Sequence, residues 1–288
     1  MKDDLQKRAD EAEEAGDLPL ALELWKERSK SDEDGIAFLQ SGRIAQELGN
    51  WTEAESAYTE ALSLQPSSSL AKFVSSPIVD LLMGALWSER TDKKRIESLQ
   101  TAKKWFLSAL EKERSAPCLT LLGAACAKLN DAASAREAFE EAIELNPNYD
   151  EAMYNLAAIE EDTDPPKARD LLERAIQIDP DYALAHQMLG RVYVKLKDLV
   201  RAEHHYRRCL QIHPSNYWCS LFLAGLLVTR KRDAEAEQIY LHAIELSPEE
   251  PGALEFYARF LEKRGRAAEA AEVRARIKPS KRDSLASP

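Results

Sequence analysis

Five prolines recur at nearly equal intervals along this chain. Pro180 and Pro214 are 34 residues apart, as are Pro214 and Pro248, while Pro147 and Pro180 are 33 apart. Pro66 has the same local context. A fixed period of this length indicates one supersecondary unit stacked on copies of itself, and three or more such units bury a continuous core between neighbours.

The residues ahead of each proline follow one template. A small residue lies twelve positions before the proline, a large apolar residue eight before, and a small residue five before. The five triplets are Ala54/Tyr58/Ala61, Ala135/Phe139/Ala142, Ala168/Leu172/Ala175, Ala202/Tyr206/Cys209 and Ala236/Tyr240/Ala243.

Residues 183–216 give the cleanest copy, and their apolar spacing predicts two helices joined at Lys197-Asp198. Gly190 and Ala202 are expected to be small because the two helix backbones cross closely there. Pro214 ends the second helix, since the residue before a proline is driven out of the helical region. The inward-facing residues are Leu189, Val192, Tyr193 and Leu196 in the first helix and Ala202, Tyr206, Cys209 and Leu210 in the second.

This pattern resembles the tetratricopeptide repeat family from about residue 2 to residue 278. Its Leu-Gly signature is present at Leu122-Gly123 and Leu189-Gly190, with near matches at Ser41-Gly42, Leu156-Ala157, Leu223-Ala224 and Tyr257-Ala258. The resemblance implies an all-α, right-handed α-solenoid of about seven or eight antiparallel helix pairs over residues 1–278. It also implies that the first helices line a concave face where peptide partners bind.

Both ends and one internal stretch depart from the template. The first copy keeps Ala9, Gly16-Asp17, Ala21 and Trp25 but has no closing proline, and the last copy has Arg274 where the others have a large apolar residue. Polar substitution in a terminal copy is typical of a cap. An irregular insertion is expected at about 67–95, followed by Ala102, Phe106 and Ala109 at repeat spacing. The polar tail 279–288 is expected to be disordered.

Composition limits the possible functions. The net charge of −11 argues against nucleic-acid binding as the main task, because phosphate contacts need a basic surface. Acidic segments (1–66 and 116–182) alternate with basic ones (67–115 and 183–216). The sequence contains no run of about 18 apolar residues, so no membrane-spanning helix is predicted. The four unpaired cysteines are typical of reduced thiols, so a cytoplasmic location is expected.

No known catalytic or cofactor motif is present, so we expect no enzyme, no cofactor and no metal site. His204-His205 is the only local group that resembles metal ligands. Adjacent helical side chains point about 100° apart and do not readily share one ion. We therefore expect both to be solvated, and His186 to be packed in the core.

The function expected from this pattern is that of a protein-interaction scaffold or adaptor. Its partner would be a protein or peptide, with neither nucleic acid nor membrane involved and the oligomeric state left open. An alternative is a regulatory or recruiting subunit of an enzyme complex that makes its contact through the 67–95 insertion or the convex faces. The residues expected to line the binding groove are Tyr154, Asn155, Leu184, Gln187, Arg191, Trp218, Leu221 and Arg259. The alternative is that Tyr154, Trp218 and Leu221 are half-buried packing residues of the superhelix.

Overall fold

The computed structural model describes residues 2–30, 35–63, 95–248 and 251–277, and these contain fifteen α-helices and no strand. The expected all-α fold of stacked helix pairs is confirmed. The helices are α1 (Lys2–Glu14), α2 (Leu18–Ser29), α3 (Ile36–Glu47), α4 (Trp51–Ser63), α7 (Arg95–Lys112), α8 (Ala116–Lys128), α9 (Ala132–Leu145), α10 (Asp150–Glu160), α11 (Pro165–Ile178), α12 (Ala183–Lys195), α13 (Leu199–Ile212), α14 (Tyr217–Thr229), α15 (Asp233–Leu246), α16 (Pro251–Lys263) and α17 (Ala267–Ala275).

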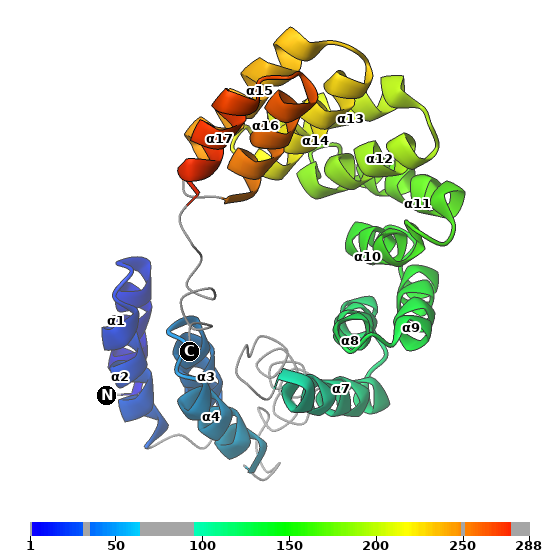
Figure 1. Cartoon of the computed structure of the whole chain (residues 1–288). Helices are drawn as coiled ribbons and strands as arrows, with labels where there is room; N and C mark the ends of the chain where they lie inside the picture. The colour runs from blue at the N-terminus through cyan, green and yellow to red at the C-terminus, as the bar shows by residue number, and fades with distance from the viewer. Residues whose placement is uncertain (1, 31–34, 64–94, 249–250, 278–288) are drawn as a thin grey trace, which may run out of the picture. The chain divides into compact units, whose positions relative to one another are not determined.

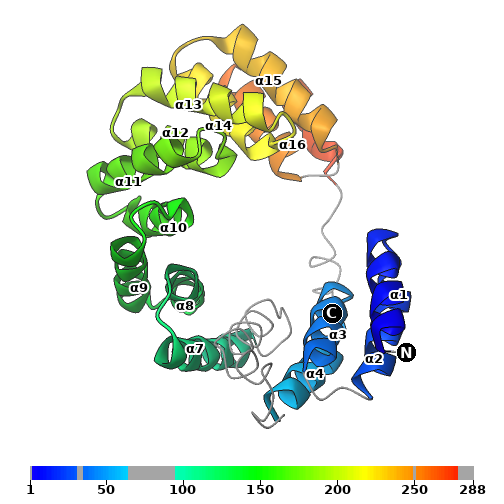
Figure 2. The same ribbon diagram turned by 180° about the vertical axis from the view of Figure 1, so that it is seen from behind.

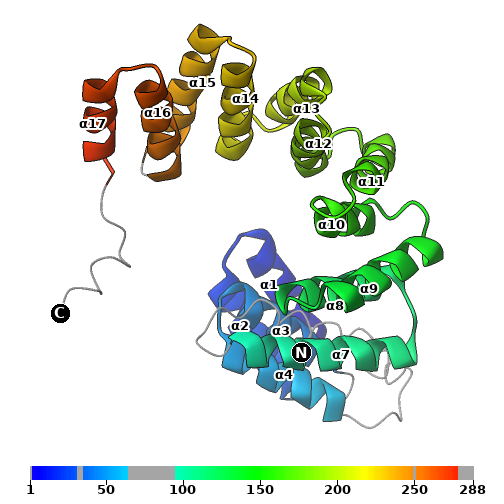
Figure 3. The same cartoon turned by 45° about the vertical axis from the view of Figure 1, so that its right-hand side comes forward.

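Backbone contacts divide the chain into two compact units, residues 1–156 and 157–288. In unit 1, α1 packs on α2, α2 on α3, α3 on α4, α7 on α8 and α8 on α9 (Figure 1). In unit 2 the same succession runs from α11 to α17, and the first helices α12, α14 and α16 also contact one another (Figures 2 and 3). Each repeat therefore buries its second helix against the next repeat. A single superhelix through both units stays a prediction.

The small and large residues of the repeat template form the seam within each pair. Every member of the five predicted triplets, and Ala102, Phe106 and Ala109, is buried. At Gly190 the expected reason for a small residue, the close crossing of two helix backbones, is wrong. A Cβ there would lie 2.5 Å from Cε1 of Tyr206, so it is the aromatic ring, not a neighbouring backbone, that requires glycine. Gly123 has the same relation to Phe139, at 2.6 Å.

The turns inside the described helix pairs share one geometry, except the turn between α10 and α11. A residue with positive φ follows the first helix, and the N–H of the next residue bonds a carbonyl five positions back, as Asp198 does to Tyr193 (2.9 Å). This is the Schellman arrangement, in which the left-handed residue is usually glycine. The left-handed positions are Gly16, Gly49, Asn130, Lys197, Lys231 and Gly265.

The residue after the left-handed position also begins the second helix. In three of these turns it is an aspartate, Asp17, Asp131 or Asp198, whose carboxylate accepts a backbone N–H three residues on. Asp164 caps α11 in the same way without a left-handed residue before it. In the last two repeats the position holds Arg232 or Arg266, and neither side chain caps its helix. An N-cap aspartate contributes about 1 kcal/mol, so these two helices lack that contribution.

The terminal repeats behave as expected. Ala9, Ala21 and Trp25 are buried in the α1–α2 pair. At the other end, Arg274 pairs with Glu255 (3.0 Å) and with Glu262, so a charged contact replaces the usual apolar one. Residues 64–94 and 278–288 lie outside the described residues, and with them most of the predicted insertion and the predicted disordered tail.

Candidate functional site

Two neighbouring first helices of unit 2, α12 and α14, present a surface of apolar, aromatic and polar side chains. Residues three and four apart on a helix share a face. Leu184, Gln187 and Arg191 follow this spacing on α12, and Trp218 and Phe222 follow it on α14. We call these five residues the α12–α14 patch. The helices that carry them pack against each other.

Arg191 links the two helices of the patch. Its Nη2 lies 2.7 Å from Oε2 of Glu161, a carboxylate with only 6% of its side chain exposed. Its guanidinium lies over the ring of Phe222, 5.8 Å from the centroid. Such a cation–π contact contributes about 0.5–1 kcal/mol where it is exposed. Arg191 is therefore held in place by groups from two other segments.

The aromatic side chains of α14 form a continuous stack. Phe222 stacks between the rings of Tyr206 (5.9 Å) and Trp218 (6.2 Å), and Trp218 also contacts Tyr217 (4.7 Å). Tyr206 is buried, whereas Trp218 is 44% exposed. The stack therefore leads from the core to solvent and ends in a large, partly exposed ring.

The polar part of the patch is ordered by Asn216, the N-cap of α14. Its Nδ2 donates to Oε1 of Gln187 (2.9 Å), and its Oδ1 accepts the N–H of Cys219 (3.0 Å). Among the described residues, the Gln187 amide nitrogen makes no side-chain hydrogen bond. Leu184 is 49% exposed on the same helix. The patch thus offers an apolar side chain, an indole ring and an amide donor to a ligand.

Leu221 does not belong to this surface. It is only 1% exposed and packs in the core, so its assignment to the binding groove is wrong. The true surface neighbour of Trp218 is Phe222, which the sequence reading missed. The spacing of four from Trp218 was the available signal.

The other predicted groove residues are on other helices. Arg259 is exposed on α16, and its Nε donates to Glu255 (2.8 Å). Hydrogen bonds from the guanidinium of Arg274, the larger effect, and from that of Arg259 lower the pKa of the Glu255 carboxyl to about 2. Tyr154 and Asn155 are half-buried on α10, within unit 1. An alignment of Tyr154 with Arg191 and Trp218 along one ligand stays a prediction.

The histidines differ in part from expectation. His186 is buried, as expected, but His205 is half-buried rather than solvated. The two Nδ1 atoms lie 3.1 Å apart, and Nε2 of His186 lies 3.1 Å from the Pro180 carbonyl. That carbonyl only accepts, so Nε2 of His186 carries its proton and Nδ1 of His205 donates to the neutral Nδ1 of His186. Burial lowers the pKa of His205 to about 4.

Within the described ranges, no three histidine, cysteine or carboxylate side chains are placed to hold a metal ion. Over the same residues, no helix combines the length and apolar character needed to cross a bilayer. The four cysteines are buried free thiols.

Three family models, each described as a tetratricopeptide repeat, match residues 7–69, 116–149 and 160–205. Two of the matches coincide with helix pairs described above, α8–α9 and α12–α13 in part. No curated protein matches this sequence.

Solved structures with similar folds include PilF of Pseudomonas aeruginosa, which is 19% identical, covers 81% of this chain and 98% of its own, and has a TM-score of 0.64. Another is the C-terminal part of a TPR repeat-containing protein from Cytophaga hutchinsonii. It is 16% identical, covers 86% of this chain and 98% of its own, and has a TM-score of 0.58. At these identities the likeness concerns the fold alone.

Proposed function

Because this chain is a tetratricopeptide repeat protein, we propose that it is a protein-interaction scaffold that binds a peptide or partner domain through the α12–α14 patch. Repeats of this family are protein-interaction modules, and a stack of them offers an extended surface rather than a closed reaction site. The partner is a protein segment that places an apolar side chain against Trp218 and backbone groups near Gln187.

The observation that carries this proposal is the ordered, partly exposed indole of Trp218. Tryptophan and arginine are over-represented among the residues that dominate binding energy at protein interfaces. Here Trp218 rests on Phe222, and Phe222 is covered by an Arg191 guanidinium that Glu161 holds in place. Because these side chains are already fixed, little conformational entropy is lost when a partner binds.

The test is quantitative affinity capture with the full chain and with two single variants. Trp218→Ala removes the exposed ring, and a hot-spot residue of this type contributes about 2 kcal/mol or more, so partner recovery falls by about thirtyfold. Leu241→Ala is the matched control, because Leu241 is 43% exposed on the second helix α15. If Trp218→Ala recovers the same partners as the unaltered chain, the assignment of the patch is wrong.

The alternative function, a regulatory or recruiting subunit that binds through the 67–95 insertion or the convex faces, has no specific observation in its favour. Residues 67–94 of that insertion lie outside the described part of the chain. Extension of the binding surface to Tyr154, Asn155 and Arg259 is likewise a proposal, for which binding by the corresponding alanine variants is the test.

A further inference from the structure

A second surface lies along the turns that join the two helices of each pair in unit 2. Neighbouring turn regions are linked by side chains. Lys195, at the end of α12, contacts Glu161 (3.2 Å), and Arg232, in the α14–α15 turn, contacts Glu203 of α13 (2.8 Å). Arg264, in the α16–α17 turn, contacts Asp233 of α15 (2.7 Å). The turns therefore follow one another along a single edge of the unit.

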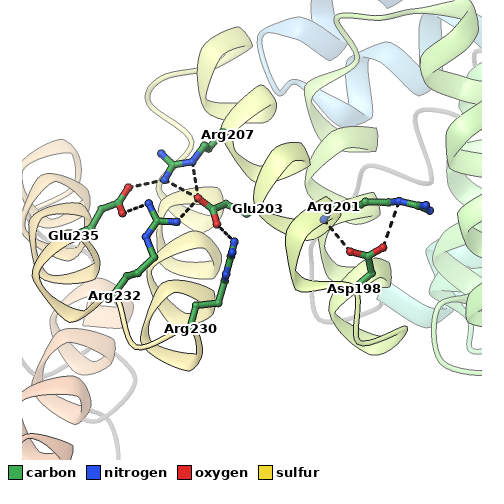
Figure 4. Close-up of polar contacts among 7 residues, drawn as sticks. All are labelled: Asp198, Arg201, Glu203, Arg207, Arg230, Arg232 and Glu235. Atoms are coloured by element: carbon green, nitrogen blue, oxygen red, sulfur yellow. Dashed lines mark hydrogen bonds and ion pairs between the residues drawn. The ribbon is translucent and has the colours of Figure 1, made fainter.

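The centre of this edge is a cluster of three arginines around one carboxylate (Figure 4). Glu203 receives Arg207 from its own helix (2.8 Å) and Arg232 from the next turn (2.8 Å), and it also pairs with Arg230. Glu235 pairs with Arg207 (2.5 Å) and with Arg232. Three guanidiniums thus face two carboxylates, which leaves one positive charge in excess.

The depth of these groups decides which charge faces solvent. Only 11% of the Glu203 side chain is exposed, against 40% for Arg207, 31% for Arg230 and 42% for Arg232. The carboxylate lies beneath the guanidiniums and fixes them. A guanidinium has five N–H donors. These contacts use Nη1 of Arg230, Nε and Nη2 of Arg207, and Nη1 and Nη2 of Arg232, so Nε of Arg230, Nε of Arg232 and Nη1 of Arg207 are not used by them. Exposed donors therefore remain available on fixed side chains.

Two lysines add positive charge to the same edge. Lys197 and Lys231 occupy the left-handed positions of consecutive turns, with φ of 62° and 59°, where other repeats have glycine or asparagine. A residue with a Cβ costs about 1 kcal/mol in this conformation. Both lysines are exposed, and neither has an ion-pair partner among the described residues. Their charges are thus free to interact with a ligand.

We infer that this basic edge, formed by Lys197, Arg207, Arg230, Lys231 and Arg232, is a docking surface for an acidic segment of a partner protein. Guanidinium and carboxylate groups have matching planar geometries and form bidentate, charge-assisted hydrogen bonds. Lys197 and Lys231 occupy the same position in consecutive turns, and the first helices of these two repeats pack together. The two turns are therefore separated by about one helix-packing distance, about 8–10 Å. An extended segment rises about 3.3 Å per residue and turns alternate side chains to the same side, so acidic residues two positions apart, about 7 Å, both face this edge within reach of the two long lysine side chains.

A carboxylate-bearing segment fits this edge better than a nucleic acid does. The edge includes Asp198 and Glu235, and the whole chain has a net charge of −11, both of which repel a long, uniformly charged phosphate backbone. A short protein segment places its few charges only where the cations are. The basic edge is separate from the α12–α14 patch, and this inference does not depend on the proposed function.

The experiment is fluorescence anisotropy with the full chain, and the probe is a short fluorescein-labelled peptide that carries glutamates at alternate positions in a glycine–serine background. We expect saturable binding that weakens as sodium chloride is added, since salt screens exposed charges. The double variant Lys197→Glu/Lys231→Glu is expected to raise the Kd about tenfold, because each exposed ion pair contributes up to about 1 kcal/mol and the reversed charges add repulsion.

Two controls make the result specific. Lys104→Glu/Lys128→Glu makes the same charge change at exposed lysines of unit 1 and is expected to leave the Kd within about twofold, because screened charges at a distance contribute little. Trp218→Ala is expected to leave it unchanged. Equal losses in the two double variants, or a loss in Trp218→Ala, would overturn the inference. Tighter binding of a DNA oligonucleotide than of the glutamate peptide would also overturn it.

Discussion

The contact between Gly190 and Tyr206 predicts a specific penalty for adding one methyl group. In Gly190→Ala, the new Cβ would lie 2.5 Å from Cε1 and 2.6 Å from Cδ1 of Tyr206. Ordinary carbon–carbon contacts lie at about 3.5–4.0 Å, so the ring must move by about 1 Å. Tyr206 is 2% exposed and stacks on Phe222, which leaves no free space for that movement.

The size of the effect follows from two opposing contributions. Overpacking in a well-filled core costs about 1–3 kcal/mol. Replacing a helical glycine by alanine contributes about 1 kcal/mol of helix propensity in the opposite direction. A ring movement of about 1 Å places the overpacking cost in the upper part of its range, about 2–3 kcal/mol, so after subtraction of the propensity gain we expect Gly190→Ala to destabilise the protein by about 1–2 kcal/mol.

Gly225 supplies the matched control. It lies inside α14, and the nearest atom to a Cβ placed there is Oη of Tyr240 at 3.9 Å, an ordinary contact. Gly225→Ala is therefore expected to stabilise the protein by up to about 1 kcal/mol. Urea unfolding followed by far-UV circular dichroism measures both changes. If Gly190→Ala is as stable as the unaltered chain, or if both variants shift equally, the ring contact is not the reason for glycine.

A double variant tests the pairing itself. At the corresponding positions of the α10–α11 repeat the chain has Ala157 and Leu172, and both are buried. Tyr206→Leu should therefore make room for the methyl group of Gly190→Ala. We expect the double variant to be more stable than the sum of the single effects predicts, with an interaction energy of about 1 kcal/mol or more.

Two further predictions concern charged groups. Folding lowers the pKa of His205 from about 6.5 in the unfolded chain to about 4. Between these pH values the unfolded state therefore binds more protons than the folded state. Lowering the pH from about 7 to 5 should then reduce the free energy of unfolding by about 2 kcal/mol. Acid titration of His205→Leu should lack this loss and that of His204→Gln should keep it, and equal pH profiles for the two variants would contradict the reasoning. Glu203→Ala removes the buried carboxylate shared by three arginines and should cost about 1–3 kcal/mol, below the full value for a buried pair because the freed guanidiniums regain water. Urea unfolding beside Glu245→Ala, whose side chain is 79% exposed, measures this, and equal midpoints would refute it.

The repeat seams could be predicted from the sequence because they depend on local spacing. Small and large residues at fixed positions before each proline identify the buried face of every second helix, and the structure buries them as expected. The surface of α14 could not be predicted as well. This helix is apolar on almost every side, so its periodicity does not indicate which face is outward. The pattern therefore does not distinguish the buried Leu221 from the partly exposed Phe222.

Side-chain contacts between helices were the other part that local patterns left open. His205 and His186 are 19 residues apart, and Glu203 and Arg232 are 29 apart. The periodicity places each residue on its own helix but does not say which charged or aromatic side chain of a neighbouring helix it meets. The exchange of aspartate for arginine at positions 232 and 266 was nevertheless visible as a break in the repeated sequence.

That exchange has a consequence for how freely these repeats can be recombined. A hairpin such as α12–α13 carries the aspartate that starts its own second helix, so the signal moves with it. The α14–α15 and α16–α17 hairpins instead direct their arginines at Glu203 and Glu237 of the hairpin before them. Transplanted behind a hairpin without such a glutamate, Arg232 and Arg266 would keep only Glu235 and Glu269 of their own hairpins as partners, and the second helix would still lack an N-cap. The ion pairs from each of these turns to the preceding hairpin therefore favour one order of the last three hairpins.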